Sequence, residues 1–352
     1  MKKIAVVVGA RPQFIKLAPL VEVLSDKVDL LLVHTGQHYD FEMSDIFFDQ
    51  LNLPKIDYHL GVGSAGQSTQ TGKMMVGLEE VFRKESPDMV VVIGDTNSTL
   101  AGTLAAAQNF IPLTHIEAGL RSKNNHMPEQ INRIVADRLS DILCCPTEGS
   151  VSNLKAEGQT SGIFLTGDIL YDLVARINPS DEFTDSILKK YDLAKGEYIF
   201  MTTHRAENVD NPDYLKSLVL GLKKIKQKIF LPLHPRTEKN LKRSQLYETI
   251  TDLPGIQISK PIGIVESLAL TKSSLGVITD SGGLQREAAY FGKRAYILRD
   301  ETEWQELSQY GAVICIDSNL DKKSLAWDSA VVPSEYFKSA SKNIADAIFS
   351  MA

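Results

Sequence analysis

Three carboxylates, Asp95, Glu117 and Glu129, lie close together in the sequence and near two short apolar runs. Asp95 follows the run at residues 89–93, and Glu117 follows the run at residues 111–116. A short, unbroken run of Val and Ile predicts a β-strand that is covered on both faces, as in a parallel sheet. Because ligands bind beyond the carboxyl ends of such strands, we expect these carboxylates to lie beside a ligand.

The residue types in this stretch indicate proton-transfer chemistry. A solvated surface would account for one carboxylate, whereas three gathered carboxylates can serve as general acids and bases. Arg121 and Arg133 follow in the same stretch and could hold an anion. Asp95, Glu117 and Glu129 are therefore the candidate catalytic residues.

A second group of candidate residues follows predicted strands in the C-terminal half, where it could bind a diphosphate. The group consists of His204 and Arg205, His234 and Arg236, and Ser281, Gly282 and Gly283. Two adjacent glycines let the backbone approach a ligand closely, and the helix after them presents N–H groups to an anion. A Ser-Gly-Gly turn alone is also an ordinary strand-to-helix connection. Glu287, one turn further on, could bind a ribose diol; a solvated helix face is the alternative.

Two basic residues stand at the start of the first predicted helix. Gly9 makes a tight turn after the apolar run at residues 4–8, and Arg11 and Lys16 follow it. The N–H groups at a helix start already favour an anion. Two solvated bases are the simpler interpretation of these residues when they are taken alone.

Composition excludes several classes of protein. The formal net charge of −6 argues against a nucleic-acid or anionic-membrane surface, since those surfaces need clustered positive charge. The apolar run after Met1 is too short for a signal peptide or a membrane span. Cys144 and Cys145 are adjacent in an apolar run and no C-x-x-C spacing occurs, so we expect neither a disulfide framework nor a metal site. A reducing cytoplasm is the expected location.

Strands alternate with helices along most of the 352 residues, which predicts an α/β fold with two Rossmann-like domains and parallel sheets. We expect strands at residues 4–8, 30–34, 89–93, 111–116, 142–145, 164–167, 198–202, 229–233, 256–258, 275–279 and 294–298. We expect helices at residues 12–20, 43–51, 69–82, 99–108, 129–139, 214–226, 264–272, 284–291 and 336–352. The charged segment at residues 168–195 breaks this alternation and is the expected domain boundary. The expected domains are residues 1–168, which the helix at 336–352 could join, and residues 169–335.

The motifs together resemble those of the non-hydrolysing UDP-N-acetylglucosamine 2-epimerases. The matching positions are Gly9 to Pro12, Gly94 to Thr96, residues 115–121, Pro128 and Glu129, Asn132 and Arg133, His204 and Arg205, residues 279–283, and Arg299 and Asp300. The resemblance implies two domains of the glycosyltransferase-B type with the active site in the cleft between them. It also implies a UDP-sugar substrate, no cofactor, no nucleic acid or membrane partner, a homodimer, and a role in the synthesis of surface-polysaccharide precursors.

The resemblance also implies a mechanism and roles for the candidate residues. Enzymes of this family remove the C2 proton of the sugar while UDP leaves from C1, which forms a glycal intermediate. A proton then returns to the opposite face of C2 and UDP is added again at C1, which gives the 2-epimer. Asp95, Glu117 and Glu129 would surround the sugar, and His204 would act at the catalytic centre. The groups that would hold UDP are Arg11, Lys16, His204, Ser281, Gly282, Gly283 and Glu287.

Several variants within the motifs look more like the family branch that acts on UDP-2,3-diacetamido-2,3-dideoxyglucuronate. They include Gln13, Asn208, Arg236 and the stretch at residues 300–304. Three rival functions stay open: a glycosyltransferase of the same architecture, a nucleotide-sugar sensor without turnover, and a hydrolysing epimerase. The three carboxylates favour an isomerase, because a transferase typically needs one base and an acceptor pocket.

Overall fold

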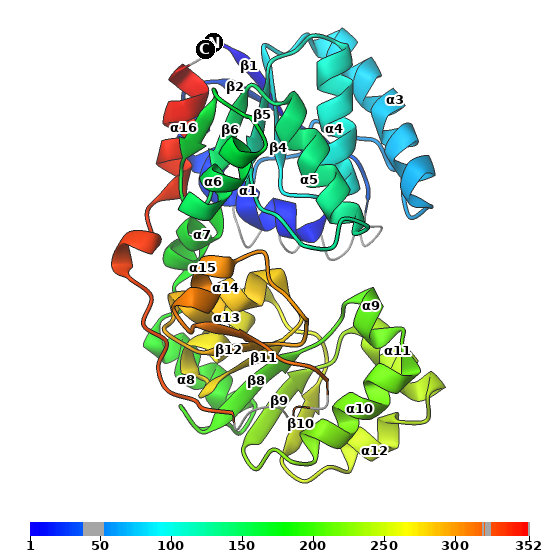
Figure 1. Ribbon diagram of the computed structural model, residues 1–352, viewed down its shortest axis with the longest axis vertical. Helices are drawn as coiled ribbons and strands as arrows, with labels where there is room; N and C mark the ends of the chain where they lie inside the picture. Colours follow the sequence, from blue (N-terminus) through cyan, green and yellow to red (C-terminus); the bar gives the residue numbers. More distant parts are fainter. Residues whose placement is uncertain (38–52, 319, 321–324, 351–352) are drawn as a thin grey trace. The chain divides into compact units, whose positions relative to one another are not determined.

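The computed structural model describes residues 1–37, 53–318, 320 and 325–350, and the chain forms two compact units (Figure 1). Unit 1 comprises Met1–Arg176 and Ser334–Ala352, and unit 2 comprises Ile177–Pro333. The boundary expected after residue 168 precedes α7 (Ile169–Ile177), so the chain leaves unit 1 about one helix later.

Unit 1 is built on a seven-stranded sheet whose paired strands all run parallel. The order is β3-β2-β1-β4-β5-β6-β7, so the strand order reverses between β1 and β4. The strands are β1 (Lys3–Val8), β2 (Asp29–His34), β3 (Tyr58–His59), β4 (Met89–Ile93), β5 (Leu113–Ile116), β6 (Ile142–Cys145) and β7 (Ile163–Leu165). Central strands such as β4 are buried along their whole length, because helices cover both faces of the sheet.

Helices of unit 1 cover the two faces of this sheet (Figure 1). They are α1 (Arg11–Leu24), α3 (Gln67–Glu85), α4 (Asn97–Gln108), α5 (Pro128–Leu139), α6 (Glu148–Ala156), α7 and α16 (Ala340–Ser350). The small residues of α4 allow close packing, since a Cβ at Gly102 would lie 2.8 Å from a methyl carbon of Val92. The C-terminal helix α16 packs against α1, and its Ile344 and Ile348 belong to the same core cluster as Leu17.

Unit 2 has a six-stranded parallel sheet in the order β10-β9-β8-β11-β12-β13, with a reversal between β8 and β11. Its strands are β8 (Tyr198–Thr202), β9 (Lys228–Pro232), β10 (Ile256–Ser259), β11 (Gly276–Thr279), β12 (Ala295–Ile297) and β13 (Val313–Cys315). Its helices are α8 (Asp181–Lys190), α9 (Ala206–Val209), α10 (Pro212–Leu222), α11 (Pro235–Arg243), α12 (Tyr247–Thr251), α13 (Ile264–Ser273), α14 (Gly282–Tyr290) and α15 (Gln305–Gln309). A 3-10 turn, η1 (Ser334–Tyr336), precedes α16.

The expected α/β class with parallel sheets is confirmed, while the segment at residues 168–195 differs from expectation. It contains two helices, α7 and α8, where no helix was expected. The apolar side of α7 is buried at Leu170, Leu173 and Val174, and Ser180 caps α8 by accepting a hydrogen bond from Phe183 N at 3.2 Å. The helix expected at residues 43–51 lies outside the described residues.

Six helices begin one or two residues earlier than expected, namely α1, α3, α4, α5, α10 and α14, and the last one begins later. Proline at the first helical position extends α5 to Pro128 and α10 to Pro212, because the missing N–H of proline costs nothing there. Helix α14 begins at Gly282, directly after the capping residue Ser281. Helix α16 begins at Ala340, because Tyr336 still belongs to a 3-10 turn and residues 337–339 are irregular.

Candidate active site

The candidate residues of unit 1 lie where the strand order reverses, at the carboxyl ends of β1, β4 and β5. A reversal of this kind opens a crevice beyond the strand ends, which is the usual ligand site of open α/β sheets. Gly9 ends β1, Gly94 and Asp95 follow β4, and Glu117 follows β5. The topology therefore brings together three loops that are far apart in the sequence.

Glu117 is a buried carboxylate held in an unusual backbone conformation. Its φ is +68°, a left-handed value that is uncommon for a residue with a side chain. The Nζ atom of Lys16, on α1, lies 2.5 Å from Glu117 Oε2, and both side chains are at most 10% exposed. Non-glycine residues in this conformation tend to persist at functional sites, where the surroundings enforce it.

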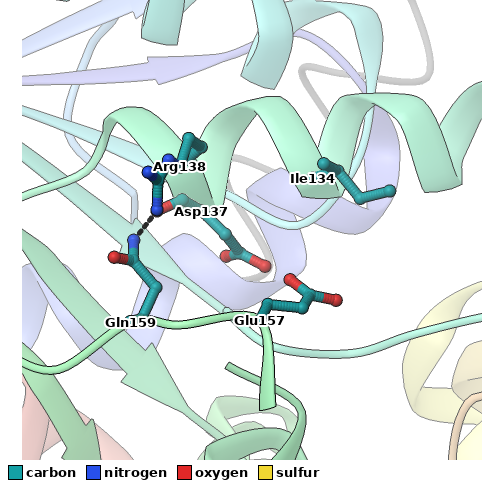
Figure 2. Close-up of a pocket in the computed structure, with 5 residues that line it drawn as sticks. All are labelled: Ile134, Asp137, Arg138, Glu157 and Gln159. Carbon is teal, nitrogen blue, oxygen red and sulfur yellow. Dashed lines mark hydrogen bonds between the residues drawn. The ribbon is translucent and has the colours of Figure 1, made fainter. Parts of the chain in front are cut away.

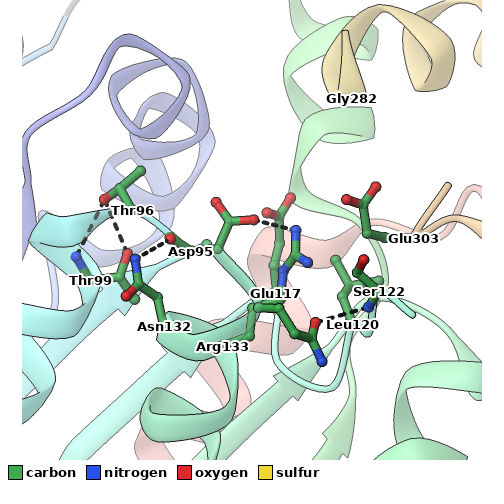
Figure 3. A network of polar contacts seen from close by, with 12 residues as sticks. Asp95, Thr96, Thr99, Glu117, Leu120, Ser122, Asn132, Arg133, Gly282 and Glu303 are labelled. Carbon is green, nitrogen blue, oxygen red and sulfur yellow. Dashed lines mark hydrogen bonds and ion pairs between the residues drawn. The ribbon is translucent and has the colours of Figure 1, made fainter. Parts of the chain in front are cut away.

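Asp95 is held by two residues of α5. Its carboxylate is paired with the Arg133 guanidinium, and its backbone carbonyl accepts a hydrogen bond from Asn132 Nδ2 at 2.8 Å (Figure 3). Glu129 is half-buried in the first turn of α5, four residues before Arg133, so the two side chains share one face of the helix. Helix α5 thus links the loop of Asp95 to the third carboxylate.

Helix α5 presents its polar side to the protein and part of its apolar side to the surface. Gln130, Arg133 and Asp137 are each at most 6% exposed, whereas Ile131 and Ile134 are 49% and 42% exposed. A helix that buries charged and amide groups must satisfy them internally, which the contacts to the strand-end loops accomplish.

Arg121, an expected anion-binding residue, is occupied by carboxylates of its own unit. Its Nη1 lies 2.6 Å from Asp137 Oδ2, and its Nε and Nη2 donate to Glu157 at 2.7 and 2.6 Å. Burial would lower the pKa of Arg121, but the hydrogen bonds and charges of Glu157 and Asp137 outweigh it and raise the pKa. These contacts favour a structural part for Arg121 over direct contact with a substrate.

Two candidate residues of unit 2, His204 and Arg205, are held by Asp280, a fully buried carboxylate that directly follows β11. Asp280 accepts hydrogen bonds from the backbone N–H groups of His204 and Arg205 at 3.0 and 2.9 Å. It also accepts hydrogen bonds from Thr203 Oγ1 at 3.0 Å and Asn208 Nδ2 at 3.2 Å. The carboxylate therefore fixes the loop that follows β8.

His204 lies beside this carboxylate and is partly exposed. Its side chain is 41% exposed, its Nδ1 lies 3.4 Å from Asp280 Oδ1, and its ring centre lies 5.5 Å from that of His234. His234 caps α11 by accepting a hydrogen bond from Arg236 N at 3.2 Å. Both histidines thus stand at the carboxyl ends of the neighbouring strands β8 and β9, as the sequence predicts.

The turn after β11 has the form of an anion-binding helix start. Ser281 caps α14 by accepting a hydrogen bond from Leu284 N at 3.3 Å, and Gly282 and Gly283 open the helix. Glu287 is 7% exposed and adjacent to the turn, because a Cβ at Gly283 would lie 3.6 Å from Glu287 Oε1. The first N–H groups of this helix have no intrahelical acceptor and can bind an anion.

Several expected binding residues lie elsewhere or already have partners. Arg236 donates through Nε to Asp210 at 2.9 Å, and this hydrogen bond raises the pKa of the guanidinium. The backbone of Arg11 begins α1, but its side chain lies outside the described part of the chain. Within the described residues, no three His, Cys, Asp or Glu side chains are placed to hold a metal ion.

Two branch variants found in the sequence serve the fold locally. Gln13 is 1% exposed; it accepts hydrogen bonds from Gly9 N and Ala10 N and donates to the carbonyl oxygen of Ile93 at 2.9 Å. Asn208 is 8% exposed and bridges Asp280 and the backbone of Leu298. The side chains of both residues are directed into the protein.

Sequence reasoning missed three buried residues that support the site, namely His115, Asp137 and Asp280. Each is a charged or ionisable residue inside or directly beside an apolar run, or on the buried face of a helix. A titratable residue within such a run is the signal that could have identified His115 and Asp280. Asp137 carries no comparable signal, since its helix turns a polar face inward.

Comparisons with known proteins agree with this arrangement. The family model described as UDP-N-acetylglucosamine 2-epimerase matches residues 22–342. A UDP-N-acetylglucosamine 2-epimerase of Methanocaldococcus jannaschii is 40% identical over 328 residues, which cover 91% of this chain and 90% of that protein. A UDP-2,3-diacetamido-2,3-dideoxy-D-glucuronate 2-epimerase of Pseudomonas aeruginosa is 43% identical over 328 residues, with 91% and 89% covered.

A solved structure extends the similarity to the fold of the whole chain. The crystal structure of the Methanocaldococcus jannaschii UDP-GlcNAc 2-epimerase in complex with UDP-GlcNAc and UDP matches with a TM-score of 0.88 and 36% identity. The match covers 99% of this chain and 100% of that one. The chain belongs to the UDP-N-acetylglucosamine 2-epimerase family.

Proposed function

We propose that this chain is an isomerase that inverts C2 of a UDP-2-acetamido sugar and converts UDP-GlcNAc to UDP-ManNAc. The observation that carries the proposal is the set of carboxylates at the strand ends of unit 1, where Asp95 and Glu117 are each paired with a cation. Inversion at an unactivated carbon needs proton removal on one face and proton return on the other, which requires more than one acid–base group.

The proposed reaction is an elimination followed by an addition. A carboxylate of unit 1 takes the C2 proton, the C2–H electron pair forms the C1–C2 double bond, and the C1–O bond breaks to release UDP. A proton then adds to the opposite face of C2, and UDP returns to C1. Asp95, Glu117 and Glu129 would act around the sugar.

The leaving diphosphate needs fixed positive charge and N–H donors. In this proposal His204 and Arg205 contact the leaving UDP, and the helix start at Ser281 to Gly283 binds its phosphates. Glu287 would accept hydrogen bonds from the ribose. We therefore propose that both units act on one ligand: unit 1 on the sugar and unit 2 on UDP.

A solvent-isotope experiment tests this mechanism. In D₂O the 2-epimer should carry deuterium at C2 with UDP still attached at C1, because a carboxyl proton exchanges with solvent before it is returned. Product that retains its original C2 hydrogen would exclude the elimination. Free N-acetylmannosamine would indicate hydrolysis, and transfer of the sugar to an acceptor would indicate a glycosyltransferase.

The second candidate substrate is UDP-2,3-diacetamido-2,3-dideoxyglucuronate. The relative from Pseudomonas aeruginosa that is named for this substrate is 43% identical to the chain, against 40% for the Methanocaldococcus jannaschii protein named for UDP-GlcNAc. Both candidates use the same chemistry at C2. The ratio of kcat/KM for the two UDP-sugars decides between them.

We also expect a homodimer that works in the cytoplasm and supplies precursors of surface polysaccharides. Exposed apolar side chains of unit 1, Val76 on α3 and Ile131 and Ile134 on α5, favour coverage by a second copy. Among the described residues, no helix is both long and apolar enough to cross a membrane. Sedimentation equilibrium of the wild type and of Ile134→Glu tests the dimer, which the charged side chain should weaken.

A further inference from the structure

His115 is a completely buried imidazole at the carboxyl end of β5, and both of its ring nitrogens have partners. Nδ1 lies 2.7 Å from Asp137 Oδ1, and Nε2 lies 2.7 Å from the carbonyl oxygen of Gly94. The exposed fraction of His115 is 0%, and that of Asp137 is 2%. The two residues belong to different elements, β5 and α5, and Gly94 ends a third element, β4.

The atoms that face the ring of His115 show how it is hydrogen-bonded. A carbonyl oxygen can only accept, so Nε2 of His115 must donate to Gly94. Burial alone would raise the pKa of Asp137, but the charges and hydrogen bonds of His115 and Arg121 outweigh it and hold the pKa below its ordinary value. The Asp137 carboxylate faces Nδ1 of His115, so the pair joins β5 to α5 through the two side chains.

The second oxygen of Asp137 extends the network to the loop after Glu117. Oδ2 accepts a hydrogen bond from Gly119 N at 3.1 Å and another from Arg121 Nη1 at 2.6 Å. Glu117, with its left-handed φ of +68°, lies between His115 and Gly119 in the chain. Its strained backbone is therefore anchored on both sides by the same buried pair.

We propose that His115 and Asp137 form a positioning pair that fixes the distances among Asp95, Glu117 and Glu129. The bond to Gly94 holds the residue before Asp95, the bonds to β5 and Gly119 hold Glu117, and Asp137 joins the helix of Glu129 to both. Neither member of the pair touches the substrate in the proposed mechanism. This inference rests on the proposed function, because it explains how the carboxylates are held at their places of action.

A purely structural polar network is the competing interpretation, and the two make different predictions. A structural network contributes to the free energy of unfolding, and the molecules that remain folded react at the normal rate. A positioning pair affects kcat in the folded protein, since a misplacement of ~1 Å costs about 10²-fold in rate. The binding of UDP, which depends on other groups, should change little.

Glu157, in a groove beside the pair, offers a matched control variant. Asp137 and Glu157 line an open groove together with Ile134, Arg138 and Gln159 (Figure 2). Glu157 is 44% exposed and pairs with Arg121 in the loop after Glu117, so it belongs to the same charge network but is not a partner of either ring nitrogen of His115. Glu157→Gln removes a charge close to the pair and should leave kcat unchanged.

The experiment combines kinetics with a measurement that needs no turnover. His115→Gln keeps a donor for Gly94 and loses the bond to Asp137, and Asp137→Asn loses the charge while keeping the volume. For both variants and for Glu157→Gln, C2 deuterium incorporation gives kcat and KM, and thermal unfolding gives the folded fraction. In the wild type, ¹⁵N-histidine NMR detects the Nε2–H proton of His115, which is assigned by its absence in His115→Gln. Amide hydrogen exchange at Ala118 and Gly119 reports whether the loop is held.

The expected result is a slowly exchanging Nε2–H proton in the wild type and, in both folded variants, a loss of kcat of about 10²-fold with KM nearly unchanged. Faster exchange at Gly119 should accompany the loss. A rapidly exchanging Nε2–H proton on His115, or folded variants with wild-type kcat, would overturn the inference. If the wild type turns over neither UDP-sugar, the proposed function fails; the ring proton and the exchange at Gly119 still decide whether the pair holds the loop.

Discussion

Replacement of Lys16 by Met tests how much the buried ion pair contributes to the candidate site. Met has nearly the same length and apolar volume as Lys, so the change removes a charge without opening a large cavity. The Nζ–Oε2 distance to Glu117 is 2.5 Å, and the side chains are 10% and 6% exposed. Glu117 would then keep a buried negative charge without its ammonium partner.

The structure sets the expected magnitude. Removal of one partner of a buried pair typically destabilises a protein by about 3–5 kcal/mol, since the remaining charge is left uncompensated. Glu117 makes further polar contacts and both side chains touch solvent slightly, so we expect the lower end, about 3 kcal/mol. For a folding unit of this size, such a loss lowers Tm by about 6–12 °C.

Thermal and urea unfolding of five proteins gives the answer: the wild type, Lys16→Met, Glu117→Gln, the double variant of these two, and Lys73→Met. Lys16→Met should unfold well before the wild type, whereas Lys73→Met, which changes an exposed lysine on α3, should stay within ~0.5 kcal/mol. Lys16→Met combined with Glu117→Gln removes both charges and should recover much of the loss. The ion pair does not stabilise the protein if Lys16→Met unfolds at the wild-type midpoint. The same conclusion follows if the double variant loses as much free energy of unfolding as the two single variants together.

Three further outcomes follow from the same contacts. Gly119 and Gly158 both have left-handed φ values, +79° and +84°, but a Cβ at Gly119 would lie 2.3 Å from a backbone oxygen and one at Gly158 would meet nothing within 4 Å. Gly158→Ala should therefore cost about 1–2 kcal/mol and Gly119→Ala clearly more, as measured by urea unfolding. Asp280→Asn should weaken UDP binding in calorimetry, because the loop of His204 loses a charged acceptor; unchanged affinity would show that the loop is held otherwise. Asp137 has a lowered pKa, so its contribution to stability is present above the ordinary Asp value of about 3.9 and is lost as the pH falls through the depressed folded value. The stability gap between wild type and Asp137→Asn should thus be widest near neutral pH and narrow in acid; a gap that is constant with pH would contradict this assignment.

Much of the fold could be predicted from the sequence, because buried parallel strands consist of unbroken runs of apolar residues. The run at Met89–Ile93 is buried at every position, as its composition predicts. Helix α8 was missed because its charged residues conceal a short apolar face at Ile187 and Leu188. Its N-terminal cap, Ser180, is a local signal that could have revealed it.

The candidate site was predictable in position and less so in its partners. The strand-end placement of Asp95, Glu117 and His204 follows from topology rules and agrees with the structure. The contacts of Arg121 could not be foreseen, since its partner Glu157 is 36 residues away and brought close only by packing. Helix α5 even reverses the usual pattern, with Ile134 exposed and Arg133 buried, so hydrophobic periodicity would have turned it the wrong way.

In both units a buried carboxylate holds a strand-end loop by accepting hydrogen bonds from its backbone N–H groups. A loop that presents reactive side chains at a strand end leaves backbone N–H groups without sheet partners, and the loop would be mobile unless those groups were satisfied. In unit 1 the carboxylate of Asp137 accepts the N–H of Gly119, and in unit 2 the carboxylate of Asp280 accepts those of His204 and Arg205. Both carboxylates are buried beneath residues that we place at the substrate. Since a buried carboxylate is costly unless it is fully hydrogen-bonded, each loop and its acid stabilise one another, and loss of either acid should disorder the loop before it unfolds the unit.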